Sequence, residues 1–174
     1  HQMLVPNHPT PTLSFPLLGG DHFDLAMEKP GFASLIVAYR GLHCPICTSY
    51  LADLERMTAD FSASGVSCVA ISMDGQGKAE AMAKKISAQQ LRIGYDLPVV
   101  MARTWSLYLS KGMREAEPGV FSEPGIYLVK PDQTLFYLSV QNMPFARPQL
   151  RDILGAVNFV VKTGYPARGD YLAG

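Results

Sequence analysis

The sequence of 174 residues has no excess of charge of either sign and no long apolar run. Lysine and arginine together number 15, as do aspartate and glutamate, so the formal net charge is +0. Without a basic surplus or a basic run, no nucleic-acid partner is expected. No apolar stretch reaches the roughly 18 residues that a membrane span requires, so no membrane association is expected.

Cysteine is also scarce. Three cysteines in a chain of this length argue against a secreted, disulfide-rich scaffold. The N-terminus lacks the charged, apolar and small-residue regions of a secretory signal. We therefore expect a cytoplasmic protein, and we interpret residues 1–2 as an artificial remnant before a natural start at Met3.

The amino-acid composition is typical of one globular domain. Hydrophobic residues make up 48% of the chain and charged residues 17%, enough to form one sizeable core. No internal repeat or domain linker is found. We predict an extended proline-rich arm over 1–11, one domain over 12–165, and a tail over 166–174.

Hydrophobic periodicity predicts alternating strands and helices. The expected elements are two short strands within 13–25, a buried strand at 34–40, a helix from Pro45 that Gly65 ends, a strand at 66–72, a helix at 75–90, a helix at 98–110, a loop at 111–122, a hairpin at 125–141 and a helix at 148–164 that Gly164 caps. The order indicates an α/β fold with a mixed sheet, in which the strands at 34–40 and 66–72 are parallel.

Two of the three cysteines stand in Cys44-Pro45-Ile46-Cys47, where the first buried strand meets the first helix. A zinc site normally takes four ligands from two such knuckles, and the histidines here lack paired spacing. A purely structural disulfide is also disfavoured, because closing so short a loop removes little entropy from the unfolded chain. We therefore expect no metal or other cofactor.

Redox chemistry has a positive physical basis at this position. A cysteine at a helix start faces unpaired backbone N–H groups and the positive end of the helix dipole, which favour the thiolate. The pKa of such a cysteine can fall from about 8.5 to between about 3.5 and 7.5. The second cysteine, one helical turn later, can resolve a mixed disulfide or a sulfenic acid.

Arg40 and His43, which precede the motif, each admit two interpretations. Arg40 and His43 could add positive potential beside the thiolate, or they could be an ordinary strand-end residue and a ring that packs over the motif. Pro45 suits the first helical turn, where its missing N–H does no harm. Cys68, inside an apolar strand, is expected to be a small buried hydrophobe rather than a distant resolving cysteine, and Trp105 is expected in the core.

The segment VAYRGLHCPICTSYLADLE resembles the F-Y-R-G-x-x-C-P-x-C block of bacterial peroxiredoxin-like proteins in the thioredoxin superfamily. The segments FSEPGIYLVKPDQTLFY, NMPFARP and GYPARGD are similar to later parts of the same group. The resemblance implies a thioredoxin-like fold, a central mixed sheet flanked by helices with an N-terminal β extension. It also implies that Pro124 is a cis-proline beside the cysteine pair.

The same resemblance implies a thiol-dependent antioxidant oxidoreductase. The P-x-x-x-T-x-x-C motif of typical peroxiredoxins is not preserved, and Ser122 and Glu123 occupy the stretch where a late arginine is expected. Thiol–disulfide exchange, peroxide reduction and a non-catalytic redox sensor therefore stay open as functions. We favour Cys44 as nucleophile and Cys47 as resolving cysteine, with Arg40, His43, Pro45 and Pro124 in support. An alignment to the motif of typical peroxiredoxins favours Cys47 as the attacking cysteine instead, so this order stays open.

The partners expected from this resemblance are a peroxide or disulfide substrate and an external thiol reductant, such as a thioredoxin or glutathione system. Dimers are common in the group, so a homodimer is compatible with it.

Overall fold

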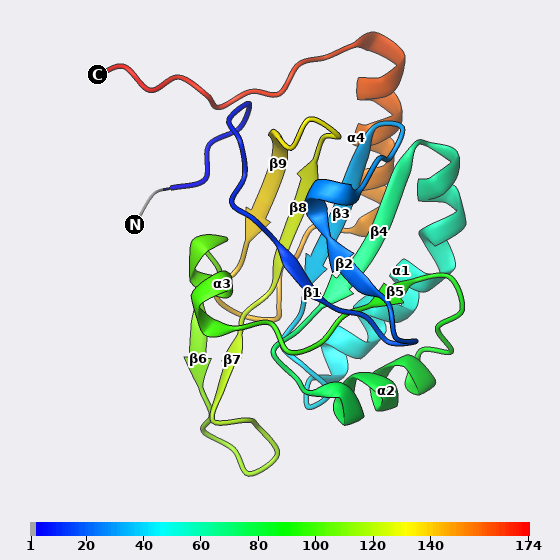
Figure 1. The fold of residues 1–174 in the computed structure, drawn as a ribbon, viewed down its shortest axis with the longest axis vertical. Helices are drawn as coiled ribbons and strands as arrows, with labels where there is room; N and C mark the ends of the chain where they lie inside the picture. Colours follow the sequence, from blue (N-terminus) through cyan, green and yellow to red (C-terminus); the bar gives the residue numbers. More distant parts are fainter. Residues whose placement is uncertain (1–2) are drawn as a thin grey trace.

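The computed structural model describes residues 3–174, so the predicted remnant at 1–2 lies outside the described residues. A five-stranded sheet forms the centre, in the order β5-β4-β3-β8-β9 (Figure 1). The elements are β1 (Ser14–Pro16), β2 (His22–Asp24), η1 (Leu25–Met27), β3 (Ala33–Ala38), α1 (Pro45–Ala63), β4 (Val66–Ile71), α2 (Gln76–Lys85), β5 (Arg92–Ile93), α3 (Val99–Thr104), β6 (Leu109–Lys111), β7 (Val120–Ser122), β8 (Gly125–Val129), β9 (Leu135–Val140) and α4 (Leu150–Thr163).

Strand β3 is the middle strand and is buried along its whole length, as its continuous apolar sequence predicts. It pairs in parallel with β4 and antiparallel with β8. Helix α1 connects the two parallel strands, which confirms the predicted β-α-β unit. The thioredoxin-like α/β fold with a mixed sheet is therefore present.

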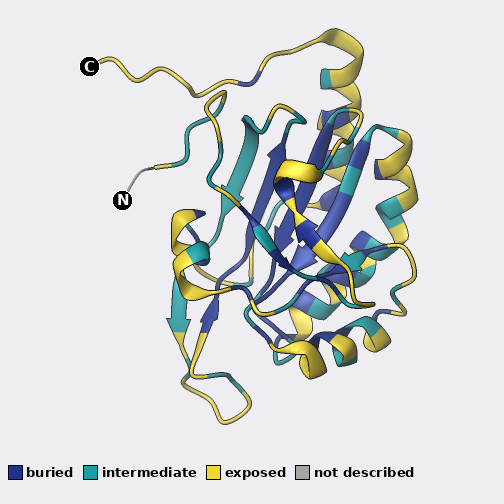
Figure 2. Ribbon diagram, viewed as in Figure 1, coloured by how far each residue is buried: buried dark blue, intermediate teal, exposed yellow. Residues whose placement is uncertain are grey.

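Helices α1, α2 and α4 cover one face of this sheet, and the N-terminal strands together with α3 cover the other (Figure 2). The core on one face brings together residues of α1, α2 and α4, among them Leu51, Met82 and Ile153. The core on the other face contains residues of the N-terminal strands, α3 and Trp105. Trp105 is 2% exposed, so its predicted place in the core is confirmed.

The N-terminal hairpin and the cap of the last helix agree with the predicted elements. Strands β1 and β2 form the expected antiparallel N-terminal hairpin. The arm before them runs beside β9, where Pro9 forms a bridge with Thr134. Helix α4 ends at Gly164, whose left-handed φ of 72° lets its N–H bond to the Val160 carbonyl.

The segment between α2 and β8 differs from the prediction. The helix expected over 98–110 ends after Thr104, and the loop expected over 111–122 contains two strands, because β6 and β7 pair as a hairpin. Tertiary contacts explain the early end of the helix. The Trp105 indole N–H donates to the Thr12 carbonyl at 3.0 Å, and Ser106 takes a left-handed φ of 60° that turns the chain away.

No helix within residues 3–174 is long and apolar enough to cross a membrane. Over the same residues, no three side chains among His, Cys, Asp and Glu gather in a way that could hold a metal ion.

Candidate active site

The cysteine motif begins helix α1. Cys44 is the residue before the first helical turn, and its backbone is extended, with φ −111° and ψ 101°. Its sulfur accepts a hydrogen bond from the Cys47 backbone N–H at 3.3 Å, as a helix-capping group does. Pro45 occupies the first helical position, where the chain needs no donor.

A buried aspartate fixes the turn that precedes the motif. The Asp74 carboxylate is 5% exposed and accepts the Leu42 backbone N–H at 2.8 Å. Gly41 has a φ of 143°, and a Cβ there would lie 2.9 Å from the Asp74 carboxylate. Asp74 therefore holds the loop between β3 and α1 against the end of β4. The only sequence signal for this role of Asp74 is that an acidic residue follows shortly after a buried strand.

The two thiols share one negative charge, and it resides on Cys44. The pKa of Cys44 is held well below its ordinary value, first because the Cys47 thiol hydrogen-bonds to it, then by the Cys47 backbone N–H and the Arg40 side chain, while burial opposes the shift. The pKa of Cys47 is raised because its thiol donates to Cys44 and is buried. At neutral pH the pair is thus a Cys44 thiolate beside a Cys47 thiol.

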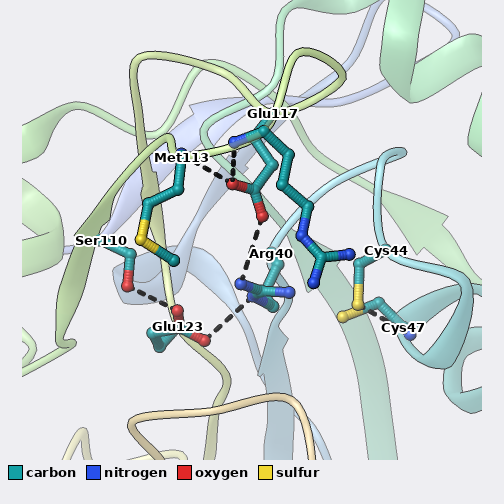
Figure 3. Close-up of polar contacts among 8 residues, drawn as sticks. Arg40, Cys44, Cys47, Ser110, Met113, Glu117 and Glu123 are labelled. Carbon is teal, nitrogen blue, oxygen red and sulfur yellow. Dashed lines mark hydrogen bonds and ion pairs between the residues drawn. The ribbon is translucent and has the colours of Figure 1, made fainter.

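Arg40 lies between two carboxylates (Figure 3). Its Nε lies 3.0 Å from Glu123 Oε1, and its Nη2 lies 3.8 Å from Glu117 Oε2. Glu123 is 3% exposed, and its other oxygen accepts the Ser110 hydroxyl at 2.6 Å. Arg40 is also among the groups that lower the pKa of Cys44. Its supporting role at the thiolate stays a prediction.

His43 packs rather than contributes charge. Its ring lies edge-on to Phe121, with the centroids 4.6 Å apart, and both ring nitrogens are buried without a hydrogen-bond partner. Burial, followed by the positive charge of Arg40, lowers the pKa of His43. The imidazole is accordingly neutral at neutral pH, which agrees with the packing interpretation.

Pro124 does not have the predicted cis bond, since no peptide bond among residues 3–174 is cis. The chain passes from β7 into β8 almost without a turn, and the Glu123 N–H donates to the Tyr108 carbonyl at 2.8 Å. A trans bond continues this extended path. The neighbouring Glu123, which sequence reasoning treated only as the place of a missing arginine, supplies the contact with Arg40.

Cys68 stays apart from the pair. It lies in β4, is 4% exposed and belongs to the core that α1 covers. Burial raises the pKa of its thiol to about 12. The prediction of a small buried hydrophobe is confirmed.

Arg147 contacts Cys47 and was not singled out by sequence reasoning. Its Nη1 donates to Cys47 Sγ at 3.6 Å, although the two residues are 100 positions apart. It lies in the loop between β9 and α4, beside a groove of about 730 Å³. The groove is lined by Ile46, Tyr50, Asp53, Arg56, Met57, Pro144, Phe145, Ala146, Arg147, Pro148, Gln149, Leu150 and Arg151. The segment that contains Arg147, NMPFARP, is notable in the sequence only for its similarity to the peroxiredoxin-like group.

The profile of the AhpC/TSA family matches residues 6–138. A search of curated proteins finds no match. Solved structures with the same fold include reduced Prx3 from Vibrio vulnificus, with a TM-score of 0.75 at 15% identity over 90% of this chain and 99% of that chain. Enterococcus faecalis AhpC has a TM-score of 0.74 at 17% identity over 99% and 100% of the two chains. Peroxidoxin BcpB from Mycobacterium tuberculosis has a TM-score of 0.73 at 13% identity over 91% and 99%.

Proposed function

Because this chain belongs to the AhpC/TSA family of thiol-dependent redox enzymes, we propose that it reduces hydroperoxides, with Cys44 as nucleophile and Cys47 as resolving cysteine. The pair lies at the start of α1, where the Cys44 sulfur accepts the Cys47 backbone N–H at 3.3 Å. A thiolate is the form of cysteine that attacks, and Cys44 is the residue that carries it.

The choice of substrate rests on the very low solvent exposure of the Cys44 thiolate. Cys44 is 3% exposed, and Arg40 is among the groups that lower its pKa. A protein disulfide must place both of its sulfurs in line with the attacking sulfur, which needs an open approach. A hydroperoxide is small enough to reach a nearly buried sulfur, so peroxide reduction fits this site better than exchange with a protein disulfide.

The proposed chemistry balances in two steps. Cys44 thiolate attacks one peroxide oxygen, the O–O bond breaks, and Cys44 becomes a sulfenic acid while the second oxygen leaves and is protonated to water or an alcohol. The Cys47 sulfur then attacks the Cys44 sulfur and releases water. The Arg40 guanidinium, beside the attacking sulfur, favours the anion that reacts in the first step.

The resulting Cys44–Cys47 disulfide requires an external reductant. Two thiol equivalents, from a thioredoxin or glutathione system, would return both cysteines to the reduced state. A reducing compartment such as the cytoplasm would supply them. The alternative, a redox sensor with little turnover, needs the same disulfide but no fast peroxide step.

Single-turnover oxidation of the reduced protein by hydrogen peroxide tests the proposal. We would quench the reaction, block free thiols and identify the oxidised cysteine by mass spectrometry. This readout is preferable to Trp105 fluorescence because Trp105 belongs to the core on the other face of the sheet.

Fast second-order oxidation is expected in the wild type. It should disappear in Cys44→Ser, and sulfenic acid should accumulate in Cys47→Ser. Oxidation of the wild type no faster than that of a free thiolate would contradict peroxide reduction and leave disulfide exchange as the reaction to test.

A further inference from the structure

Arg147 is held in place by two contacts besides Cys47, and one of its partners is itself anchored. Its Nε donates to the Pro144 carbonyl at 3.0 Å within the same loop. Its guanidinium lies over the Tyr50 ring, 4.4 Å from the centroid. The Tyr50 hydroxyl in turn donates to the Pro148 carbonyl at 2.7 Å. Helix α1 and the loop before α4 therefore fix this cation beside the Cys47 sulfur.

The charge of Arg147 has no anionic partner in the reduced protein. Among residues 3–174, no carboxylate forms an ion pair with it. Its Nη2 is buried without a hydrogen-bond partner, and Cys47 is 0% exposed. A half-buried cation that contacts a neutral thiol and has a buried nitrogen without a partner is poorly compensated. Two titratable groups are in contact with it, Cys47 and Tyr50. Burial raises the pKa of the Tyr50 phenol, so Cys47 is the group of the two that can become an anion near neutral pH.

We propose that Arg147 is the positioning residue that activates Cys47 for the resolving step, and that it acts only after Cys44 has been oxidised. This inference rests on the proposed function, in which Cys47 attacks the Cys44 sulfenic acid. It goes further by naming the group that makes Cys47 nucleophilic at the right moment.

The timing follows from the groups that face Cys47. Before oxidation the Cys44 thiolate accepts a hydrogen bond from the Cys47 thiol and repels a second negative charge, so Cys47 stays protonated. Tyr39, which follows β3, stays neutral and adds no negative charge, because burial raises its pKa. Oxidation turns Cys44 into a neutral sulfenic acid and removes both effects. The positive charge of Arg147, which lowers the pKa of Cys47, then acts without opposition from Cys44.

The step balances without another reactant. Cys47 loses its proton, and the thiolate attacks the Cys44 sulfur. The S–O bond breaks and an S–S bond forms. The released hydroxide takes the proton and leaves as water, so the sulfenic acid is reduced while Cys47 is oxidised.

The first test follows sulfenic acid and disulfide separately during one turnover with hydrogen peroxide. In Arg147→Gln, conversion of the sulfenic acid to disulfide should be at least about tenfold slower near neutral pH, because each unit of rise in pKa lowers the thiolate fraction about tenfold. The pH profile of this phase should move to higher pH, and Arg147→Lys should restore part of the rate. Arg151→Gln, an exposed arginine of the same groove, is the matched control.

The second test needs no peroxide. In Cys44→Ser, the pKa of Cys47 is measured from its thiolate absorbance, with Cys44→Ser/Cys47→Ser as the blank. Adding Arg147→Gln should raise that pKa, with near-ultraviolet circular dichroism confirming that the fold is kept. An unchanged pKa together with unchanged disulfide formation would overturn the inference.

The two tests also separate the inference from the function on which it rests. If the wild type is not oxidised by peroxide, the proposed function fails, whatever the pKa of Cys47 shows. If peroxide oxidises Cys44 normally but Arg147→Gln resolves at the wild-type rate, the function stands and the role of Arg147 is wrong.

Discussion

The two cysteines of the motif stand one helical turn apart, and each has its own arginine, but the two arginines differ in their surroundings. Arg40, beside Cys44, has Glu123 and Glu117 as counter-ions. Arg147, beside Cys47, has no carboxylate partner among the described residues. A paired arginine can support a standing thiolate, whereas an unpaired one favours a thiolate that is yet to form. This difference supports the proposal that the two cysteines act in successive steps.

The largest effect is expected from removing the paired arginine. Arg40→Gln takes away a donor and a positive charge from Cys44, so its pKa should rise and peroxide oxidation should slow by about tenfold or more. It also leaves Glu123 buried without its cation, which should lower the free energy of unfolding by about 3–5 kcal/mol. Urea unfolding and the pH dependence of Cys44 alkylation measure the two effects.

The double variant Arg40→Gln/Glu123→Gln separates stability from chemistry. Removing both charges should recover most of the lost stability, while the pKa of Cys44 stays high. If the double variant also regains wild-type reactivity, Arg40 acts on the fold and not on the thiolate.

The free energy of unfolding should depend on pH through the ionisation of the Cys44 thiol. Its pKa is lower in the folded protein than in the unfolded chain, so its contribution to stability is full above the unfolded value of about 8.5 and is lost as pH falls through the lower, folded value. The difference in unfolding free energy between wild type and Cys44→Ser should therefore shrink by more than about 1 kcal/mol on acidification through this window. A difference that is constant with pH would contradict a stabilised thiolate.

A smaller effect on stability is expected from changing Asp74, which holds the turn before Cys44. Asp74→Ala removes the acceptor of the Leu42 N–H and should destabilise the protein by about 1–3 kcal/mol. Asp74→Asn keeps an acceptor oxygen and is the matched control. Thermal unfolding compares them, and equal losses in both variants would show that the hydrogen bond is not what holds the turn.

The smallest effect is expected at the third cysteine. Cys68→Ala removes one buried sulfur from the core and should lower stability by about 1 kcal/mol, with peroxide kinetics unchanged. Slower disulfide formation in this variant would give Cys68 a redox role that its burial does not indicate.

The sequence predicted the parts of this site that are local. A buried strand, a proline in the first turn and apolar residues at helical spacing predict where Cys44 and Cys47 lie, because backbone geometry fixes them. Glu123, Asp74 and Arg147 reach the site through contacts between distant segments, and no local pattern encodes those contacts. The short helix α3 and the β6–β7 hairpin were mispredicted for the same reason, since Trp105 and strand pairing override local helix preference.

The most direct test of the account is brief alkylation of the reduced protein at about pH 6, well below the usual thiol pKa of about 8.5, followed by mass spectrometry of the modified sites. The account predicts that Cys44 is modified first, while Cys47 and Cys68 remain thiols. Modification of Cys47 before Cys44 would contradict the account, because it would place the standing thiolate beside Arg147 instead of Arg40.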